Sequence, residues 1–328
     1  MRISVALCTY NGESYLEHQL ESIARQTRKP DELVVCDDQS NPVTKKILKD
    51  FAARACFPVR LFFNQVNLGT FKNFEQAIEL CTGDVIALSD QDDVWHPHKL
   101  SRLASVFSAK PKVGLAFSDA EVVMHDLRPA AFNLWERTFC PQDQKLFKAG
   151  KAFEVLLKRN VVTGATMAFR SQFKELILPI TETVYRYHDG WIALMIAAAA
   201  EVEFIPEPLI LYRQHDEQLV GLRPQPNSKT KPRLSYDGLH SLVSRDYNYS
   251  HDITQLDIYF KRLFSRRGAF DCRRSLLWLE NLINHYQARD QMPLKRMERI
   301  QVILHELKSR NYFYYSKGFR SILKDLLC

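Results

Sequence analysis

The stretch from Val85 to Trp95, VIALSDQDDVW, joins a short apolar run to three closely spaced carboxylates. The run at residues 85–88 has the length and composition of a buried strand, so Asp90, Asp92 and Asp93 would follow its carboxyl end. Open α/β sheets bind their ligands at that edge. Neighbouring carboxylates do not all stay ionised without a counter-charge, so the stretch predicts a divalent cation and, with it, a phosphorylated ligand.

Strand-like and helix-like segments alternate around this stretch. Short apolar runs at residues 3–8, 33–36 and 60–63 predict further buried strands. Amphipathic helices are expected at residues 14–25, 43–55, 71–81 and 98–107. This alternation is typical of a parallel α/β sheet with helices on its faces.

Polar residues follow each predicted strand and would meet at one edge of the sheet. Thr9 and Tyr10 could contact a base and ribose, and Asp38 could accept a hydrogen bond from a base N–H. Gly69 would allow the backbone to approach a ligand closely. The simpler alternative is that the acidic loop at residues 37–40 only caps the helix expected from residue 43. Asp93 is likewise expected to cap the helix that opens near residue 97.

Composition excludes several classes of protein. A chain of 328 residues with 46% hydrophobic and 25% charged residues is expected to fold as one large core, or as one core with an added lobe. Its longest uncharged run in the later half, residues 191–200, is far shorter than the roughly 20 residues that cross a bilayer. The first residues lead straight into a polar segment, so we expect no signal peptide and a cytosolic location. Seven cysteines without a CxxC pair indicate reduced, structural thiols.

The excess of positive charge lies in the C-terminal part. Residues 229–328 hold 19 Lys and Arg against 10 Asp and Glu, a net charge of +9, whereas residues 1–228 have −2. A segment rich in proline and basic residues predicts a linker at 222–233, between a first domain at 1–221 and a basic helical region at 234–328. Helical apolar spacing recurs there at 256–264, 276–286 and 297–307, and an aromatic, basic segment at 312–328 follows. Such a region either lies on an anionic membrane surface, packs against the first domain with its charges solvated, or pairs with a second copy of the chain.

Several motifs together are similar to those of a known enzyme family. In chain order they are VALCTYNGESYLEHQLESIARQT (5–27), DELVVCDDQS (31–40), NQVNLGTFKNFEQAIELCTGDVIALSDQDDVWHPHKL (64–100), AFSDAEVV (116–123), VVTGATMAFR (161–170), HDGWIALMIAAAA (188–200) and PLILYRQH (208–215). The series resembles the inverting glycosyltransferases of family 2, particularly their bacterial rhamnosyltransferase-like branch, over residues 1 to about 221. The resemblance implies a GT-A fold, in which a mostly parallel nucleotide-binding sheet with helices on both faces is closed by an acceptor-side half.

The resemblance also implies roles for individual residues on the donor side. Asp90 and Asp92 match the family's DxD motif, which holds Mn²⁺ or Mg²⁺ on the donor's diphosphate, and His215 would be a further metal ligand. Residues implied in binding the nucleotide sugar are Thr9, Tyr10, Asp38, Asn67, Gly69, Asn73, Asp90 and Arg213. The cation would neutralise the charge that grows on the nucleoside diphosphate as the sugar bond breaks.

On the acceptor side, Asp189 matches the position of the catalytic base, which takes the proton from the acceptor hydroxyl. Its alternative role is to cap the helix that begins near Trp191. Asp119 is the second candidate for the base, or could orient a sugar. Thr163, Gly164 and Trp191 correspond to positions that line the acceptor side.

The segment after His215 departs from the family pattern. Residues 216–218 are Asp-Glu-Gln, where the family tends to have a small residue and asparagines. This departure concerns the loop that would close over the donor.

The leading hypothesis is a metal-dependent, inverting glycosyltransferase that acts in surface polysaccharide biosynthesis. It would move a sugar from a dTDP- or UDP-sugar, with L-rhamnose from dTDP-rhamnose as one candidate, to a saccharide or lipid-linked acceptor. A nucleotidyltransferase would share the sheet and the metal, but normally has a Gly-rich basic loop after the first strand, which CTYNGESYLEHQL lacks. The third class is a non-catalytic nucleotide-sugar-binding protein. No nucleic-acid partner is expected, because a pI near 9.0 is the only feature of the sequence that favours nucleic-acid binding. Through its C-terminal region the protein would contact the membrane peripherally or self-associate.

Overall fold

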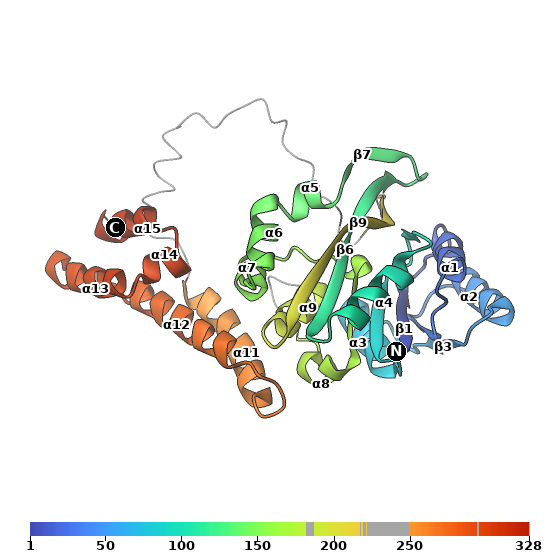
Figure 1. Ribbon diagram of the computed structural model, residues 1–328, viewed down its shortest axis with the longest axis horizontal. Coiled ribbons are helices and arrows are strands. Elements are labelled where there is room, and N and C mark those ends of the chain that lie inside the picture. The colour runs from blue at the N-terminus through green and yellow to red at the C-terminus, as the bar shows by residue number, and fades with distance from the viewer. Residues whose placement is uncertain (182–186, 217, 219–220, 222–248, 294, 328) are drawn as a thin grey trace. The chain divides into compact units, whose positions relative to one another are not determined.

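A nine-stranded sheet, with strands between residues 3 and 214, forms the centre of the N-terminal part of the chain (Figure 1). The computed structural model describes residues 1–181, 187–216, 218, 221, 249–293 and 295–327, which cluster into two units, Met1–Leu222 and Arg223–Cys328. The predicted linker at 222–233 lies outside the described residues.

The strands are β1 (Ile3–Thr9), β2 (Glu32–Asp37), β3 (Val59–Phe63), β4 (Val85–Ser89), β5 (Val94–Trp95), β6 (Val113–Met124), β7 (Pro129–Asn133), β8 (Met167–Arg170) and β9 (Glu201–Gln214). They pair in the order β3-β2-β1-β4-β8-β6-β9-β5, and β7 pairs with β6. Strands β1 to β4 are parallel to one another, as the sequence predicts. The rest of the sheet is mixed, because β8 runs antiparallel to both β4 and β6, whereas β9 is parallel to β6.

The helices of this unit are α1 (Leu16–Ala24), α2 (Pro42–Arg54), α3 (Gly69–Leu80), α4 (Lys99–Ala109), α5 (Trp135–Thr138), α6 (Pro141–Lys148), α7 (Ala152–Lys158), α8 (Lys174–Ile177) and α9 (His188–Ala197), with 3₁₀ turns at Gly164–Thr166 and Ser171–Phe173. The first four coincide with the predicted helices to within a few residues. Strands β1, β2 and β4 are buried along their whole length, as near-continuous apolar strands are in a parallel sheet covered on both faces. The α/β fold class is therefore confirmed.

Two predicted helix caps are wrong. The side chain of Asn41, not the acidic loop before it, caps α2 by accepting hydrogen bonds from the N–H groups of Val43 and Thr44. Helix α4 begins at Lys99 without a side-chain cap, so Asp93 does not cap it. Helix capping therefore does not explain why these acidic residues lie at the edge of the sheet.

The second unit is helical, with α11 (Tyr249–Arg266), α12 (Arg273–Asp290), α13 (Arg296–Lys308), α14 (Asn311–Tyr315) and α15 (Phe319–Leu327). Helix α11 packs against α12, and α13 to α15 pack around Ile303, Tyr312 and Ile322. The three helical segments predicted here lie inside α11, α12 and α13. Within the described ranges, no helix combines the length and apolar character that a bilayer crossing requires.

Candidate active site

The carboxyl ends of β1, β2 and β4 lie side by side at one edge of the sheet. In the strand register Thr9 is opposite Asp37, and Leu7 is opposite Ser89. The loops after these strands therefore start next to one another, which brings together the polar residues predicted from three separate segments of sequence. The Thr9 hydroxyl donates to Asp37 (2.8 Å), which fixes the first two loops together.

Asp38 is the centre of a hydrogen-bond network that lines this edge of the sheet, and we call this network the polar wall. It is buried, and its carboxylate accepts hydrogen bonds from the N–H groups of Leu68 (2.7 Å) and Gly69 (2.9 Å) and from the side chain of Asn64 (3.0 Å). Gly69 has a φ of +78°, a conformation that glycine adopts without strain. A carboxylate has about four acceptor positions, so Asp38 can still accept from a ligand.

Two further asparagines complete the wall. The side chain of Asn64 also donates to Asn73, which in turn donates to the backbone oxygen of Cys36 (2.9 Å). Asn67 donates to the backbone oxygen of Asp38 (3.3 Å). The structure thus joins four predicted donor-site residues, Asp38, Asn67, Gly69 and Asn73, in one hydrogen-bond network.

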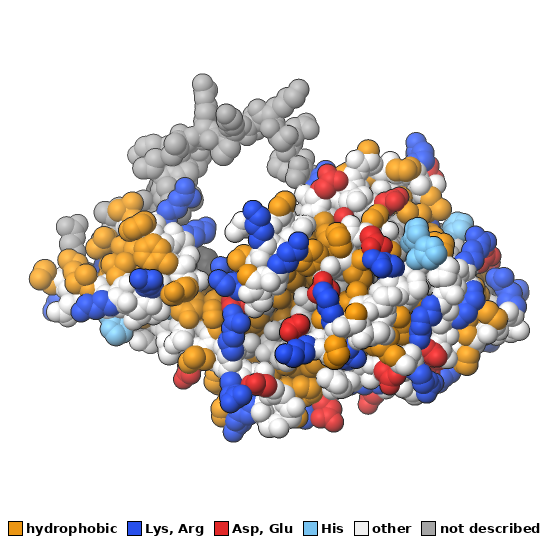
Figure 2. Space-filling view, viewed as in Figure 1, with side chains coloured by type: hydrophobic (Ala, Val, Ile, Leu, Met, Phe, Trp, Pro, Cys, Tyr) orange, Lys and Arg blue, Asp and Glu red, His pale blue; other side chains and the backbone are white. Residues whose placement is uncertain are grey.

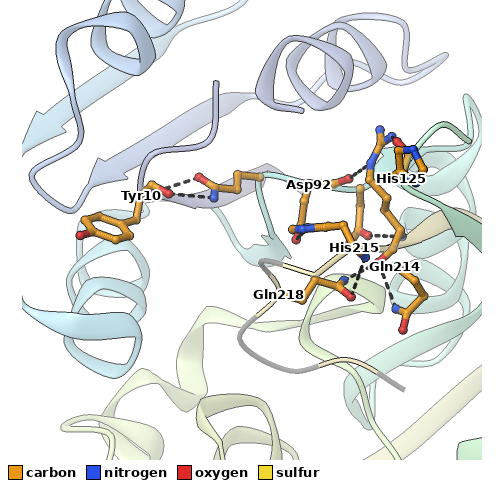
Figure 3. Close-up of polar contacts among 9 residues, drawn as sticks. Tyr10, Asp92, His125, Gln214, His215 and Gln218 are labelled. Carbon is orange, nitrogen blue, oxygen red and sulfur yellow. Dashed lines mark hydrogen bonds and ion pairs between the residues drawn. The ribbon is translucent and has the colours of Figure 1, made fainter. Parts of the chain in front are cut away.

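Hydrogen bonds fix the backbone of Tyr10, whereas its ring is exposed to solvent. The side chain of Gln91 accepts from the Tyr10 N–H (2.8 Å) and donates to the Tyr10 oxygen (3.0 Å), while the ring points away from these bonds and is 52% exposed (Figure 3). A Cβ at Gly12 would lie 2.3 Å from the Gln91 Oε1 atom, so a glycine is needed there for the Gln91 side chain to reach Tyr10. An exposed aromatic ring beside a polar wall suits stacking on a flat ligand.

The acidic loop after β4 concentrates negative charge. Burial, together with the charges of Asp92 and Asp189, raises the pKa of Asp90 to about 7. Burial also raises the pKa of Asp93, with added increases from Asp92 and Asp90. Asp93 Oδ2 is buried and has no hydrogen-bond partner among the described residues. The loop therefore favours a bound cation.

Lys99 is the counter-charge that the protein itself supplies. It is fully buried, its amine lies 3.8 Å from the centre of the Trp95 ring, and it donates to the backbone oxygen of Ala165. Burial lowers its pKa to about 7, although the charges of Asp93 and Asp90 act in the opposite direction. The sequence does not predict this role for Lys99, which there looks like an ordinary polar residue of the amphipathic helix at residues 98–107.

Arg213, at the end of β9, braces the acidic loop. Its backbone N–H donates to Asp93 Oδ1 (3.1 Å), and its side chain donates to the backbone oxygens of Asp92 and His125 (both 2.6 Å). The guanidinium also lies over the ring of Tyr15, 4.6 Å from its centre. Its Nη2 atom is buried without a partner among the described residues, so it remains available to an anionic ligand.

His215 lies beside the same loop. Its Nε2 atom is 3.0 Å from Asp92 Oδ2 (Figure 3). Its ring is tilted by 40° against that of Tyr15, with the ring centroids 4.5 Å apart. Within the described residues, no three histidine, cysteine or acidic side chains are grouped so as to hold a metal ion. Mg²⁺ and similar ions are, however, often held by one or two carboxylates together with substrate phosphates. Asp90, Asp92 and the imidazole provide such a partial set, so the residues fit a cation that arrives with a diphosphate.

Asp189 reaches the site from the first turn of α9. Its carboxylate accepts from the Asn160 side chain (3.1 Å) and from the N–H groups of Gly164 (3.2 Å) and Gly190 (2.6 Å). It lies close enough to the loop for its charge to raise the pKa of Asp90. Since Tyr187 is the N-cap residue of α9 and Asp189 lies in its first turn, Asp189 does not have the alternative role of a cap.

His188 packs behind Asp189. Its ring stacks on Phe74 with centroids 4.0 Å apart, and both ring nitrogens are buried without a partner among the described residues. Burial lowers its pKa, so the ring is neutral near pH 7, and the Asp189 charge acts in the opposite direction. His188 therefore supports the first turn of α9 without adding charge to it.

The remaining predicted residues lie around this centre. Asp119 is buried in β6 and accepts from the N–H groups of Ala120 (2.8 Å) and Trp135 (3.0 Å), so much of its carboxylate is occupied by the start of α5. The backbone oxygen of Thr163 accepts from Thr166, which closes the turn that presents the Gly164 N–H to Asp189. Trp191 is fully buried and donates to the oxygen of Ile177 (2.8 Å), which places it behind the site.

Comparison with known proteins gives this geometry a context. Residues 4–176 match the family model described as Glycosyl transferase family 2. An uncharacterized glycosyltransferase of Nostoc sp. is 30% identical over 224 residues, which are 66% of this chain and 65% of the relative. An uncharacterized protein of Mycobacterium tuberculosis is 26% identical over 220 residues, 65% of this chain and 59% of its own length. The match thus spans less than two thirds of either relative.

Among solved structures, S. aureus TarS 1–349 in complex with UDP-GlcNAc superposes with a TM-score of 0.54. The two chains are 15% identical, and the match covers 98% of this chain and 90% of TarS 1–349. At that identity the likeness concerns the fold, which it shows to be a GT-A arrangement followed by helices.

Proposed function

Because this chain belongs to glycosyl transferase family 2, we propose that it moves a sugar from a nucleoside diphosphate to an acceptor hydroxyl, with inversion at the sugar carbon. The observation that carries the proposal is the placement of Asp189. Its carboxylate comes from α9 and lies close enough to the acidic loop after β4 to raise the pKa of Asp90. Direct displacement needs such a carboxylate, opposite the leaving group, to take the acceptor's proton.

The edge formed by β1 and β2 is the proposed nucleotide subsite. The Tyr10 ring would stack on the base, and Thr9 and Asp38 would contact base and ribose beside the wall that Asn67, Gly69 and Asn73 complete. The exposed ring and the fixed polar wall support this assignment. A UDP- or dTDP-sugar is the proposed donor, and the UDP-GlcNAc complex of the TarS neighbour supports a uridine nucleotide as the first to test.

The acidic loop is the proposed diphosphate subsite. Asp90 and Asp92, with His215, would hold Mn²⁺ or Mg²⁺. When bound, the ion would neutralise the charge of the departing nucleoside diphosphate. Arg213 would add a hydrogen bond to the diphosphate from its Nη2 atom, which has no partner among the described residues. Its Nε and Nη1 atoms already donate to the backbone oxygens of Asp92 and His125.

The proposed proton transfer takes place at Asp189. Its carboxylate is oriented by hydrogen bonds from Asn160, Gly164 and Gly190. Gly164 and Thr163 would border the acceptor, and Asp119 would orient it. A screen of sugar nucleotides and acceptors would identify the sugar, for which L-rhamnose is one candidate, and the saccharide or lipid-linked acceptor.

The proposal can be tested without knowing the acceptor. The purified chain is titrated calorimetrically with UDP, dTDP and GDP, with and without Mn²⁺, and then incubated with the corresponding sugar nucleotides. We expect metal-dependent binding of one nucleotide, lost in Asp92→Ala, and slow release of that nucleoside diphosphate as water replaces the acceptor. Release of pyrophosphate in a parallel incubation with a nucleoside triphosphate and a sugar 1-phosphate would instead indicate a nucleotidyltransferase, and nucleotide binding with neither reaction a non-catalytic protein.

The base is tested by Asp189→Asn, which keeps the shape of the side chain. Donor binding should be unchanged, whereas donor turnover should fall by about 10²- to 10⁴-fold, as expected when a general base is removed. Asp84→Asn is the matched control, because Asp84 is exposed and lies at the opposite end of β4. Turnover near the wild-type rate in Asp189→Asn would refute the assignment of the base. Inversion is tested separately, by determining the anomeric configuration of the transferred sugar by NMR.

A further inference from the structure

The second unit exposes an unusual concentration of large hydrophobic side chains. Of the seventeen large hydrophobic residues that are exposed in the described part of the chain, eight lie between residues 297 and 326. Single exposed hydrophobic residues are normal on a protein surface, but a contiguous group indicates a site that contacts another body.

These side chains form two stripes on two helices that touch. Met297, Ile300 and Leu304 occupy one face of α13, and they are 75%, 39% and 51% exposed. On α15 the corresponding residues are Phe319, Leu323 and Leu326, which are 75%, 57% and 38% exposed. Their spacings of three and four residues keep each stripe on one side of its helix. We refer to these six residues as the α13/α15 face.

The α13/α15 face has a rigid base. Ile303 of α13 and Ile322 of α15 are buried in one cluster with Tyr312. Below it, Arg289 forms a two-bonded ion pair with Asp325, at 2.7 and 2.9 Å. The apolar residues are therefore displayed by packed helices and are not the exposed core of an unfolded segment.

Basic side chains border the face. Lys308 continues the α13 stripe by one turn, and Arg320 and Lys324 each follow a stripe residue on α15. None of these three forms an ion pair with a carboxylate in the described residues, and the nearby acidic residues Glu306 and Asp325 are already paired with His285 and Arg289. In Figure 2 the hydrophobic side chains gather over α14 and α15, with blue Lys and Arg side chains around them.

The charge decides which partner fits. Residues 295–328 contain eight Lys and Arg against three Asp and Glu, a net charge of +5. In a symmetric dimer the same face meets itself, so two sets of unpaired cations would be brought together as the apolar stripes meet. An anionic bilayer surface instead accepts the apolar side chains between its acyl chains and places its headgroups beside the cations.

We propose that the α13/α15 face docks the protein on an anionic lipid surface. The two helices lie in the plane of the interface, with the six stripe residues inserted and Lys308, Arg320 and Lys324 against lipid phosphates. The docking is peripheral and independent of catalysis by the first unit.

The test is sedimentation of the full-length chain with vesicles of phosphatidylcholine, with or without phosphatidylglycerol. We expect binding to the anionic vesicles, weak binding to the neutral ones, and loss of binding in roughly 1 M salt, where the Debye length is about 3 Å. Leu323→Ser should weaken binding about tenfold or more, since the variant lacks a leucine side chain that inserts among the acyl chains in the bound state. The matched control is Leu277→Ser, because Leu277 is a leucine of α12 that is 61% exposed and lies outside the face.

A second pair of variants tests the cations. Arg320→Gln and Lys324→Gln should each weaken binding to anionic vesicles about fivefold, as expected for one cation near an anionic membrane, and leave neutral vesicles unaffected. Lys261→Gln, an exposed lysine of α11, is the control. Absence of vesicle binding, equal effects of Leu323→Ser and Leu277→Ser, or a dimer in light scattering that Leu323→Ser dissociates would each overturn the proposal, the last in favour of a second copy.

Discussion

Asp90→Asn is expected to stabilise the ligand-free protein while abolishing donor binding. The pKa of Asp90 is raised from 3.8 to about 7, chiefly by burial. One pKa unit corresponds to about 1.4 kcal/mol, so the ionised carboxylate destabilises the folded state by up to about 4 kcal/mol. The folded protein binds this proton more tightly than the unfolded chain does. The penalty is therefore absent below pH 3.8, grows as the pH rises, and is complete above a pH of about 7.

Urea unfolding, with no metal added, measures this effect. At about pH 8 the unfolding free energy of the Asn variant should exceed that of the wild type by up to about 4 kcal/mol, and at about pH 5 by about 1.6 kcal/mol. Adding Mn²⁺ with the nucleotide that the chain binds should reverse the order, because only the wild type is stabilised by ligand. Asp84→Asn, which removes an exposed carboxylate from the other end of β4, should change neither value. A pH-independent difference, or a less stable Asp90→Asn protein, would refute the reasoning.

Two further variants test the supporting contacts. Although burial acts against it, hydrogen bonds from hydroxyl, amide and guanidinium neighbours lower the pKa of Glu32 to about 2. Glu32→Gln should therefore cost about 3 kcal/mol of unfolding free energy at neutral pH, and the difference should shrink below a pH of about 4.5 and vanish near 2, whereas exposed Glu79→Gln should have no such effect. Gly12→Ala should weaken nucleotide binding about tenfold in calorimetry, because the new methyl group displaces Gln91 from the Tyr10 backbone. Gln91→Ala should have the same effect and the double variant no more, so additive losses would contradict this explanation.

The parallel half of the fold could be predicted because its signals are local. Apolar runs and amphipathic spacing identify β1 to β4 and α1 to α4 from their own residues. The second half gave weaker signals. Strand β9 contains two prolines and three glutamates, and its fourteen residues become a strand only by pairing along β6, more than eighty residues earlier in the chain. The antiparallel direction of β8 likewise depends on partners that its four residues do not specify.

The same division holds for the candidate site. Loop residues at strand ends, such as Asp38 and Asp92, could be identified because a parallel sheet brings those ends together. The partners of these residues could not. Asp93 accepts from the backbone of Arg213, 120 positions away, and Lys99 was hidden in an ordinary amphipathic pattern. Capping preferences predicted the wrong role for Asp93 because they consider only neighbours along the chain.

The hydrogen bonds of Asp38 imply an order of events in ligand recognition. The wall that includes Asn67, Gly69 and Asn73 is assembled during folding, so a nucleotide would meet a preformed surface and lose little affinity to loop ordering. The Tyr10 ring, by contrast, projects from a fixed backbone and is exposed. Substitutions at Tyr10 should therefore change how strongly a base is held by stacking, while the preformed wall, through Asp38, continues to select which base is bound.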